Sequence, residues 1–136
     1  TLFDQGAAMA DLVQQMRDDL NLHGHALTQP RLEMMAEAID GLESSYQLLL
    51  SKASRDVTFA GSISFDLLML CGYVCGAWQM VRSASLVTSE QNEQFKENKL
   101  ATVNYFLDHL LPRSECHRRS IVCGSESVMA ISADNL

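Results

Sequence analysis

The chain contains the stretch Lys99-Leu-Ala-Thr-Val-Asn-Tyr105-Phe-Leu-Asp-His-Leu-Leu111-Pro112-Arg113, in which apolar residues recur at helical spacing on both sides of Pro112. A proline inside a helix removes one backbone donor, and its ring clashes with the carbonyl four residues earlier, so most helices end before it. Here the helical pattern continues through Cys116 and Ile121 to Cys123. A helix that continues through its own kink needs neighbouring helices to hold it. The stretch therefore predicts one long, kinked helix within a helical bundle.

The composition fits a single all-α domain over residues 1–136. Hydrophobic residues make up 47% of the chain, and seven glycines and two prolines leave little material for a turn-rich β fold. The net charge is −7, and residues 1–66 carry ten acids against four bases. An acidic chain without a basic face argues against a nucleic-acid partner. Because a helical pattern starts soon after Thr1, we expect a domain excised from the C-terminal part of a longer protein.

Two helices are expected in the first part of the chain. The first should run from about Leu2 to Leu22, with a break around Gly24. The second should begin near residues 28–29 and place Pro30 in its first turn, where the missing donor costs nothing. Its apolar positions are spaced by alternating steps of three and four, as in a bundle seam: Leu32, Met35, Ile39, Leu42, Tyr46, Leu49 and Ala53.

A third helix is expected from roughly Ser62 to Ser83. It is apolar on nearly all sides, which predicts the most buried helix of the bundle. Gly72 and Gly76 lie one turn apart, so we expect a groove where a neighbouring backbone packs closely. The longest uncharged apolar run, residues 67–78, has 12 residues and is too short to span a bilayer. No transmembrane segment is therefore expected.

The kinked helix should begin near Ser89. Thr88-Ser-Glu-Gln91 matches a capping box, in which the Thr and Gln side chains satisfy each other's free backbone amides. The helix should continue past the proline to about Cys123, and Gly124 should end it by adopting a left-handed conformation. Residues 126–131 are expected to form a short C-terminal helix.

Short connections at residues 54–61 and 83–88 favour an antiparallel up-down arrangement. Long helices joined in this way pack with neighbours inclined at about 20°. We therefore predict an all-α, antiparallel up-down four-helix bundle with a Pro-kinked last long helix and a short C-terminal helix. The handedness of the bundle does not follow from the sequence.

Metal chemistry finds little support in the sequence. A di-iron carboxylate site requires Glu-x-x-His motifs, and the chain has none. The four cysteines lie outside Cys-x-x-Cys pairs in apolar helical surroundings, which predicts buried free thiols in a reducing compartment and a cytoplasmic location: Cys71, Cys75, Cys116 and Cys123. A four-thiolate cluster is the alternative if the two helix faces met, and core packing is favoured over it.

No catalytic residue is assigned. His109 follows Asp108 directly, and neighbouring residues on a helix do not face each other. His23 and His25 flank Gly24 in an expected turn and form only a weak metal motif. No Gly-x-Ser-x-Gly elbow and no glycine-rich phosphate loop are present. We therefore assign no catalytic, cofactor-binding or metal-ligating residue to this chain.

One basic cluster lies after the kink and comprises Arg113, His117, Arg118 and Arg119. A solvated helix face that complements the negative helix C-terminus is the favoured interpretation. Docking to an acidic partner surface is the alternative.

The kinked helix resembles the extreme C-terminal domain of bacterial acyl-CoA dehydrogenases. The resemblance rests on the quoted stretch with its lysine, small pair, aromatic pair and Leu-Pro-Arg, followed by Ile121-Val-Cys-Gly124 and Ser127-Val-Met129-Ala-Ile. The specific match covers about residues 96–136, and a general match in helical layout covers the whole chain.

The resemblance implies a parent flavoprotein that uses FAD to remove a proton and a hydride from an acyl-CoA thioester. The catalytic glutamate, the FAD contacts and the acyl-CoA pocket belong to the family's catalytic core, so none is transferred to this chain. An accessory role does carry over: packing on that catalytic core and contributing to a homo-oligomer. The residues that match the family motif are candidates for structural or interface contacts: Lys99, Tyr105, Pro112 and Arg113.

Two other functions are compatible with the sequence. The first is a free-standing helical adaptor or oligomerisation module without a flavoprotein parent. The second is a bundle that binds a metal or an apolar ligand between its helices, where seven methionines would suit an adaptable lining. The missing ligand spacing disfavours the metal site, and the methionines suit an ordinary core equally well.

Overall fold

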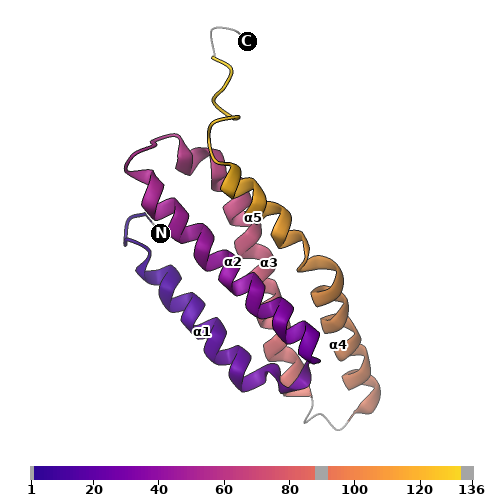
Figure 1. Ribbon diagram of the computed structural model, residues 1–136. Helices are drawn as coiled ribbons and strands as arrows, with labels where there is room; N and C mark the ends of the chain where they lie inside the picture. Colours follow the sequence, from indigo (N-terminus) through magenta and orange to yellow (C-terminus); the bar gives the residue numbers. More distant parts are fainter. Residues whose placement is uncertain (1, 88–91, 133–136) are drawn as a thin grey trace.

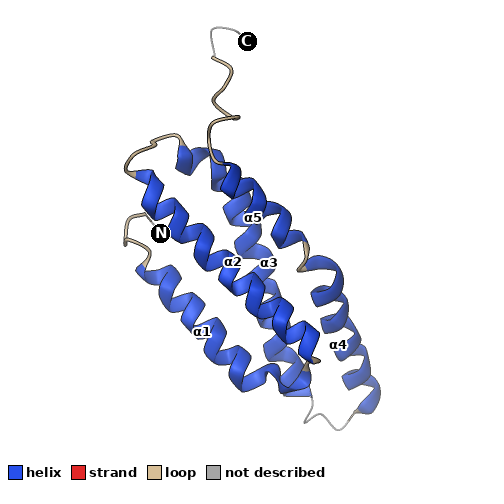
Figure 2. Cartoon of the chain, in the orientation of Figure 1, coloured by secondary structure: helices blue, strands red, loops and turns tan. Residues whose placement is uncertain are grey.

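The computed structural model describes residues 2–87 and 92–132, and these residues form helices and turns without a strand. Long helices lie side by side as an up-down bundle (Figures 1 and 2). The elements follow each other as α1 Ala7–His23, η1 Gly24–Ala26, α2 Gln29–Ala53, α3 Phe59–Val87, α4 Glu93–Tyr105, η2 Phe106–Leu110 and α5 Arg113–Cys123. We refer to α4, η2 and α5 together, residues 93–123, as the kinked rod. The prediction of an all-α bundle with a kinked last helix is confirmed.

The first helix begins five residues later than predicted. Gln5 and Gly6 have positive φ values of 53° and 83°, which interrupt the helical pattern after Leu2. Asp4 accepts hydrogen bonds from the backbone amides of Gly6 and Ala8 at 3.1 and 2.9 Å. These bonds satisfy free amides at the helix start and hold the pKa of Asp4 below its usual value.

The second helix begins at Gln29 with Pro30 in its first turn, as predicted. The third helix is longer than predicted at both ends. It starts at Phe59 because Asp56 accepts hydrogen bonds from the backbone amide and the hydroxyl of Thr58 at 2.9 and 2.7 Å. It ends at Val87.

The kinked rod contains a π-helical turn where the proline interrupts it. The predicted capping box at residues 88–91 lies outside the described residues, and the side chain of Asn92 caps α4 by accepting from the Phe95 amide at 3.1 Å. In η2 the amide of Leu111 donates to the carbonyl of Phe106, five residues back, at 2.9 Å. The rod bends by 31°. The wider turn takes up the backbone disruption that Pro112 causes, so the rod continues into α5.

The chain after the kinked rod differs from the prediction. Gly124 ends α5 with a φ of 76°, a region that favours glycine. Residues 126–131 then form turns and bends rather than the expected short helix. Val128, Met129 and Ile131 stay 60%, 55% and 64% exposed, so no burial stabilises a helix there.

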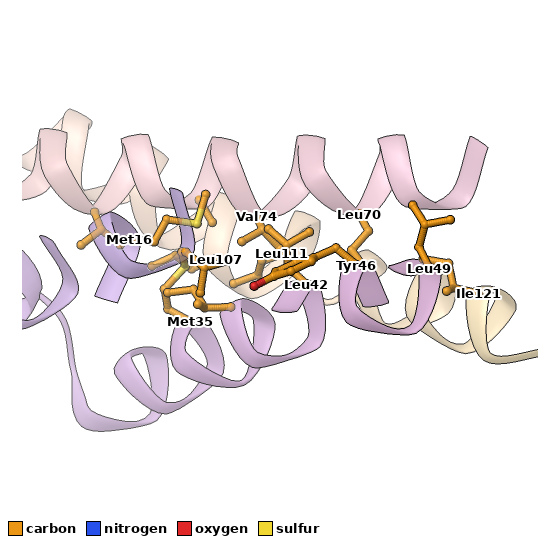
Figure 3. Close-up of a cluster of buried hydrophobic side chains, with 14 of the residues drawn as sticks. Met16, Met35, Leu42, Tyr46, Leu49, Leu70, Val74, Leu107, Leu111 and Ile121 are labelled. Atoms are coloured by element: carbon orange, nitrogen blue, oxygen red, sulfur yellow. The ribbon is translucent and has the colours of Figure 1, made fainter. Parts of the chain in front are cut away.

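The helices form a rhombic bundle with α2 and α3 at its centre. These two helices contact each other, and each also contacts α1 and the kinked rod. In Figure 1, α1 and the kinked rod lie on opposite sides of the α2–α3 pair. Figure 3 shows Tyr46, Leu49, Leu70 and Val74 of α2 and α3 interleaved with Leu107 and other side chains of the kinked rod. These buried residues make one continuous hydrophobic core.

The third helix is less buried than its composition predicted. Its inner face is fully buried, but Phe65, Leu68 and Leu86 on the outer face are 65%, 70% and 70% exposed. The groove expected at the two glycines is also corrected. A side-chain carbon at Gly76 would lie 2.7 Å from the ring tip of Phe106, so this glycine accommodates a ring rather than a backbone. Gly72 faces open space.

Candidate functional site

The kinked rod is fastened to the start of α2 by a bidentate ion pair. Arg31 donates from Nε and Nη2 to the two carboxylate oxygens of Asp108 at 2.9 and 2.7 Å. The guanidinium lowers the pKa of Asp108, because it hydrogen-bonds only the charged form. Asp108 therefore serves η2 as an anchor and is turned away from its neighbour His109, whose ring lies 4.9 Å from that of Tyr105.

A hollow of about 350 Å³ lies beside the kink, between α2 and α5. Its walls are mostly apolar and come from Met34, Ala38, Gly41, Leu70, Leu111 and Pro112. At its mouth, Arg118 donates twice to Glu115 at 2.6 and 2.7 Å, which lowers the pKa of Glu115 to about 2. These two charges neutralise each other, and the other carboxylate at the hollow is that of Glu37, which is exposed to solvent.

The four candidates from the family motif do not meet at one place. Pro112 borders the hollow, while Lys99 is half-buried two turns before the kink. Tyr105 is 59% exposed, and Arg113 is exposed directly after the proline. They are distributed along the kinked rod with Tyr105 and Arg113 open to solvent. Their role in an interface stays a prediction.

The predicted basic cluster is divided between two partners. Arg118 and Arg119 both donate to Glu115 on their own helix. His117 points to α3 instead, where its Nδ1 lies 2.8 Å from a carboxylate oxygen of Asp66. The ring of Tyr73 stacks on His117 with centroids 5.8 Å apart. Arg113 and Arg119 keep the solvated character that the sequence predicted for the whole cluster, and the side chain of Arg119 is 77% exposed.

A serine, a histidine and an aspartate that form no recognisable motif in the sequence meet between α1 and α3. Ser85 Oγ lies 2.8 Å from His23 Nδ1, and His23 Nε2 lies 4.0 Å from Asp19. Asp19 and His23 are one helical turn apart, which was the only signal in the sequence. Ser85 comes from 62 residues further along the chain, so only the fold brings it there.

The geometry of this group suits packing rather than hydrolysis. The distance of 4.0 Å between His23 and Asp19 is too long for the hydrogen bond that orients a catalytic histidine. Asp19 instead accepts from the indole nitrogen of Trp78 at 2.8 Å. Ser85 lies within α3, where helical hydrogen bonds occupy the backbone amides that an oxyanion hole would need. The group fastens α1 to α3.

The cysteines are free, as predicted, but only two of the four are even partly buried. Cys71 and Cys75 are half-buried on α3, whereas Cys116 and Cys123 are exposed on α5, because the outer side of α5 has no covering helix. Burial raises the pKa of Cys71 to about 11 and also raises that of Cys75, so both stay protonated near neutral pH. Within residues 2–87 and 92–132, no three His, Cys, Asp or Glu side chains are grouped to hold a metal ion.

One helix of the described chain, α3, is long and apolar enough to cross a membrane by length and composition. Its most apolar window has a mean hydropathy of 1.5, and 22% of that window is buried in the bundle. Because α3 also forms the inner wall of the core, the same composition serves the packing of the bundle.

The fold and the side-chain geometry define a helical-bundle domain whose polar groups mostly fasten one helix to another. A family model for acetyl-CoA dehydrogenase C-terminal-like domains matches residues 7–132. The chain therefore belongs to this family, and the predicted resemblance is confirmed. No curated protein and no solved structure gives a significant match.

Proposed function

We propose that the chain is the non-catalytic C-terminal accessory and assembly domain of an FAD-dependent acyl-CoA dehydrogenase. The family match across residues 7–132 is the observation that carries this proposal. The parent enzyme would remove a proton and a hydride from the α and β carbons of an acyl-CoA thioester, in the cytoplasm and in fatty-acid oxidation. The bundle would pack on its catalytic core.

The residues of this chain do not fit an FAD site. A flavin dinucleotide needs backbone amides that cradle its pyrophosphate, commonly at a glycine-rich turn before a helix. The helix starts among the described residues are capped by side chains or carry no such turn. The hollow at the kink is small, and Glu37 borders it with negative charge. We therefore assign FAD and the dehydrogenation to the rest of the parent protein.

The proposal is tested with the isolated chain and the full-length parent. The isolated chain should be colourless and inactive on acyl-CoA substrates of any length. The parent should be yellow and should transfer electrons from an acyl-CoA to an artificial acceptor. Flavin bound in stoichiometric amount to the isolated chain would overturn the proposal, as would a coding region that starts at this domain.

A free-standing oligomerisation module is the second candidate. The observation that favours it is the exposed apolar face of α3, which the bundle itself does not cover. The coding sequence upstream of Thr1 separates the two candidates, because only the first requires a catalytic core there.

A further inference from the structure

The outer face of α3 has the spacing of a coiled-coil seam. Eight residues follow each other in steps of four and three: Gly61, Phe65, Leu68, Gly72, Cys75, Gln79, Arg82 and Leu86. This average period of 3.5 residues is the one at which a helix keeps a single stripe against a partner helix. We call these eight residues the outer seam. The inner face of α3 already packs on the core of the bundle, so the outer seam is a second apolar surface, separate from the first.

The bundle leaves the outer seam open. Phe65, Leu68 and Leu86 are at least 65% exposed, and a side-chain carbon at Gly72 would meet nothing within 4 Å. The most exposed residues of α3 are Gly61, Ser64, Phe65, Leu68, Gly72, Gln79 and Leu86. The seam contains one charged side chain, Arg82, which is 43% exposed and pairs with Asp19 of α1 at 3.5 Å. With 29 residues, α3 is about 44 Å long, so the stripe extends over most of one side of the molecule.

We propose that the outer seam binds the outer seam of a second copy of this chain. The two α3 helices run parallel, and a two-fold axis runs along them. This inference extends the assembly part of the proposed function by naming the surface and its partner. The open position at Gly72 lets the two helices approach closely at the middle of the seam.

The charges beside the seam favour a second copy in this orientation. On one side of α3 lies α1, with three aspartates and one arginine; on the other lies the kinked rod, with five bases and four acids. A two-fold axis parallel to α3 places α1 of one copy opposite the kinked rod of the other, so opposite charges meet. An antiparallel pair would instead place the acidic α1 helices opposite each other, which is unfavourable.

Contacts within the bundle show which charges share a level along α3. Asp19 bonds Trp78, so Asp11, two turns earlier on the parallel helix α1, lies near the level of Gly72. On the kinked rod, which runs antiparallel to α3, His117 bonds Asp66, so Arg113, one turn before His117, lies near the level of Leu70. Asp11 of one copy and Arg113 of the other therefore come to the same level in the dimer. Both are exposed.

The first test measures the mass of the isolated chain by sedimentation equilibrium across a concentration series. We expect a reversible dimer of two 15.1 kDa chains. Leu68→Glu places two carboxylates in the seam and should weaken the dimer about tenfold or more. Ser44→Glu on the outer face of α2 is the matched control and should leave the dimer unchanged. Leu68 is 70% exposed, so the variant should fold, which circular dichroism checks.

A second pair of variants tests the orientation. Arg113→Glu should weaken the dimer, and the double variant Asp11→Arg with Arg113→Glu should restore it, because the charge pair is exchanged. In a background with Cys71, Cys75, Cys116 and Cys123 changed to Ser, Gln79→Cys should be joined to its own counterpart by a short bismaleimide. Ser44→Cys in the same background is the control, and two copies of it should not be joined by the reagent.

Several results would overturn the proposal. If the chain stays monomeric at every concentration, or if Leu68→Glu does not affect the dimer, the outer seam is not a dimer interface. Failure of the Gln79→Cys link in a dimer that Leu68→Glu does disrupt would exclude the parallel arrangement. Binding of the chain to phosphatidylcholine vesicles, lost in Leu68→Glu, would assign the seam to a membrane surface instead. None of these results bears on whether the full-length parent oxidises acyl-CoA, so the proposed function is tested separately.

Discussion

The helices α2 and α3 hold equivalent places at the centre of the bundle, yet their outer faces differ. Each contacts the other, α1 and the kinked rod. The outer face of α2 is polar, with Glu33, Glu37, Asp40 and Ser44 among its exposed residues. The outer face of α3 exposes Phe65, Leu68 and Leu86, and its one charged side chain, Arg82, pairs with Asp19 of α1 at 3.5 Å. Since the fold demands the same of both helices, the apolar face of α3 has its cause outside the bundle.

The largest expected effects concern the inner faces, where the two helices should behave alike. Leu42 on α2 and Leu70 on α3 are 0% and 1% exposed. Changing either to Ala removes buried methyl groups and leaves a cavity, so each should cost about 2–5 kcal/mol in urea unfolding. Leu68→Ala, measured below the concentration at which the chain associates, should cost less than about 0.5 kcal/mol. A large loss of unfolding free energy for Leu68→Ala in the monomer would show that the outer face of α3 packs within the bundle, contrary to the comparison of the two helices.

Alanine substitutions at the glycines that face the kinked rod should have different effects on stability in α2 and in α3. A side-chain carbon at Gly76 of α3 would lie 2.7 Å from the ring tip of Phe106, which packs against the core. Gly76→Ala should therefore cost about 1–3 kcal/mol of unfolding free energy. At Gly41 of α2 the nearest atom is the Arg118 Cδ at 3.0 Å, which belongs to a flexible side chain. Gly41→Ala should cost clearly less, and equal costs would show that Phe106 moves freely.

On the outer face of α3, adding a methyl group should stabilise the monomer. Gly72 lies in the middle of the helix and faces open space. Gly72→Ala should raise the free energy of unfolding by about 0.5–1 kcal/mol, because alanine restricts the unfolded chain and favours the helix. Thermal unfolding of a dilute sample measures the gain. A loss of stability would mean that something already packs against Gly72.

The smallest expected effect concerns the ion pair through which α2 holds the kinked rod. Arg31 lowers the pKa of Asp108, so the pair stabilises the fold above the ordinary carboxyl pKa of 3.8 and loses its effect as the pH falls through the lowered value. Asp108→Asn should cost about 0.5 kcal/mol near neutral pH, because the pair is exposed to solvent. The difference from the unmodified chain should disappear in acid. Glu37→Gln, whose carboxylate forms no ion pair among the described residues, should show no such pH dependence.

Hydrophobic periodicity and local signals in the sequence predicted most of the helices and several of their ends. Pro30 marked the start of α2, and the spacing of Met35, Ile39 and Leu42 identified its buried face. Gly124 marked the end of the kinked rod. The length of α1 was overestimated, because hydropathy does not show the positive φ values at Gln5 and Gly6. The prediction of a short helix at residues 126–131 was wrong, because the sequence does not show whether apolar side chains find a partner in the fold.

Long-range geometry could not be predicted in the same way. An apolar helix was expected to be buried all round, but burial depends on how many neighbours the topology supplies, and α3 has none on its outer side. The meeting of Ser85 with His23 and of His117 with Asp66 depends on pairings more than 50 residues apart in the chain. The division of the basic cluster between Glu115 and Asp66 follows from the same pairings. These are properties of the packed bundle and not of any one segment.

The π-helical turn at residues 106–110 makes the chain tolerant of a change in length at one place. Each residue of an α-helix turns the following ones by about 100°, whereas a π-helical turn takes about one residue more to complete the same rotation. Deletion of a single residue in this turn would tighten it to an ordinary helical turn and leave α5 facing the same way, so Ile121 would stay buried. Deletion of one residue elsewhere in the kinked rod would rotate the part that follows and take its buried side chains out of the core. Among natural variants of this domain, gaps of one residue within the kinked rod should therefore fall at residues 106–110.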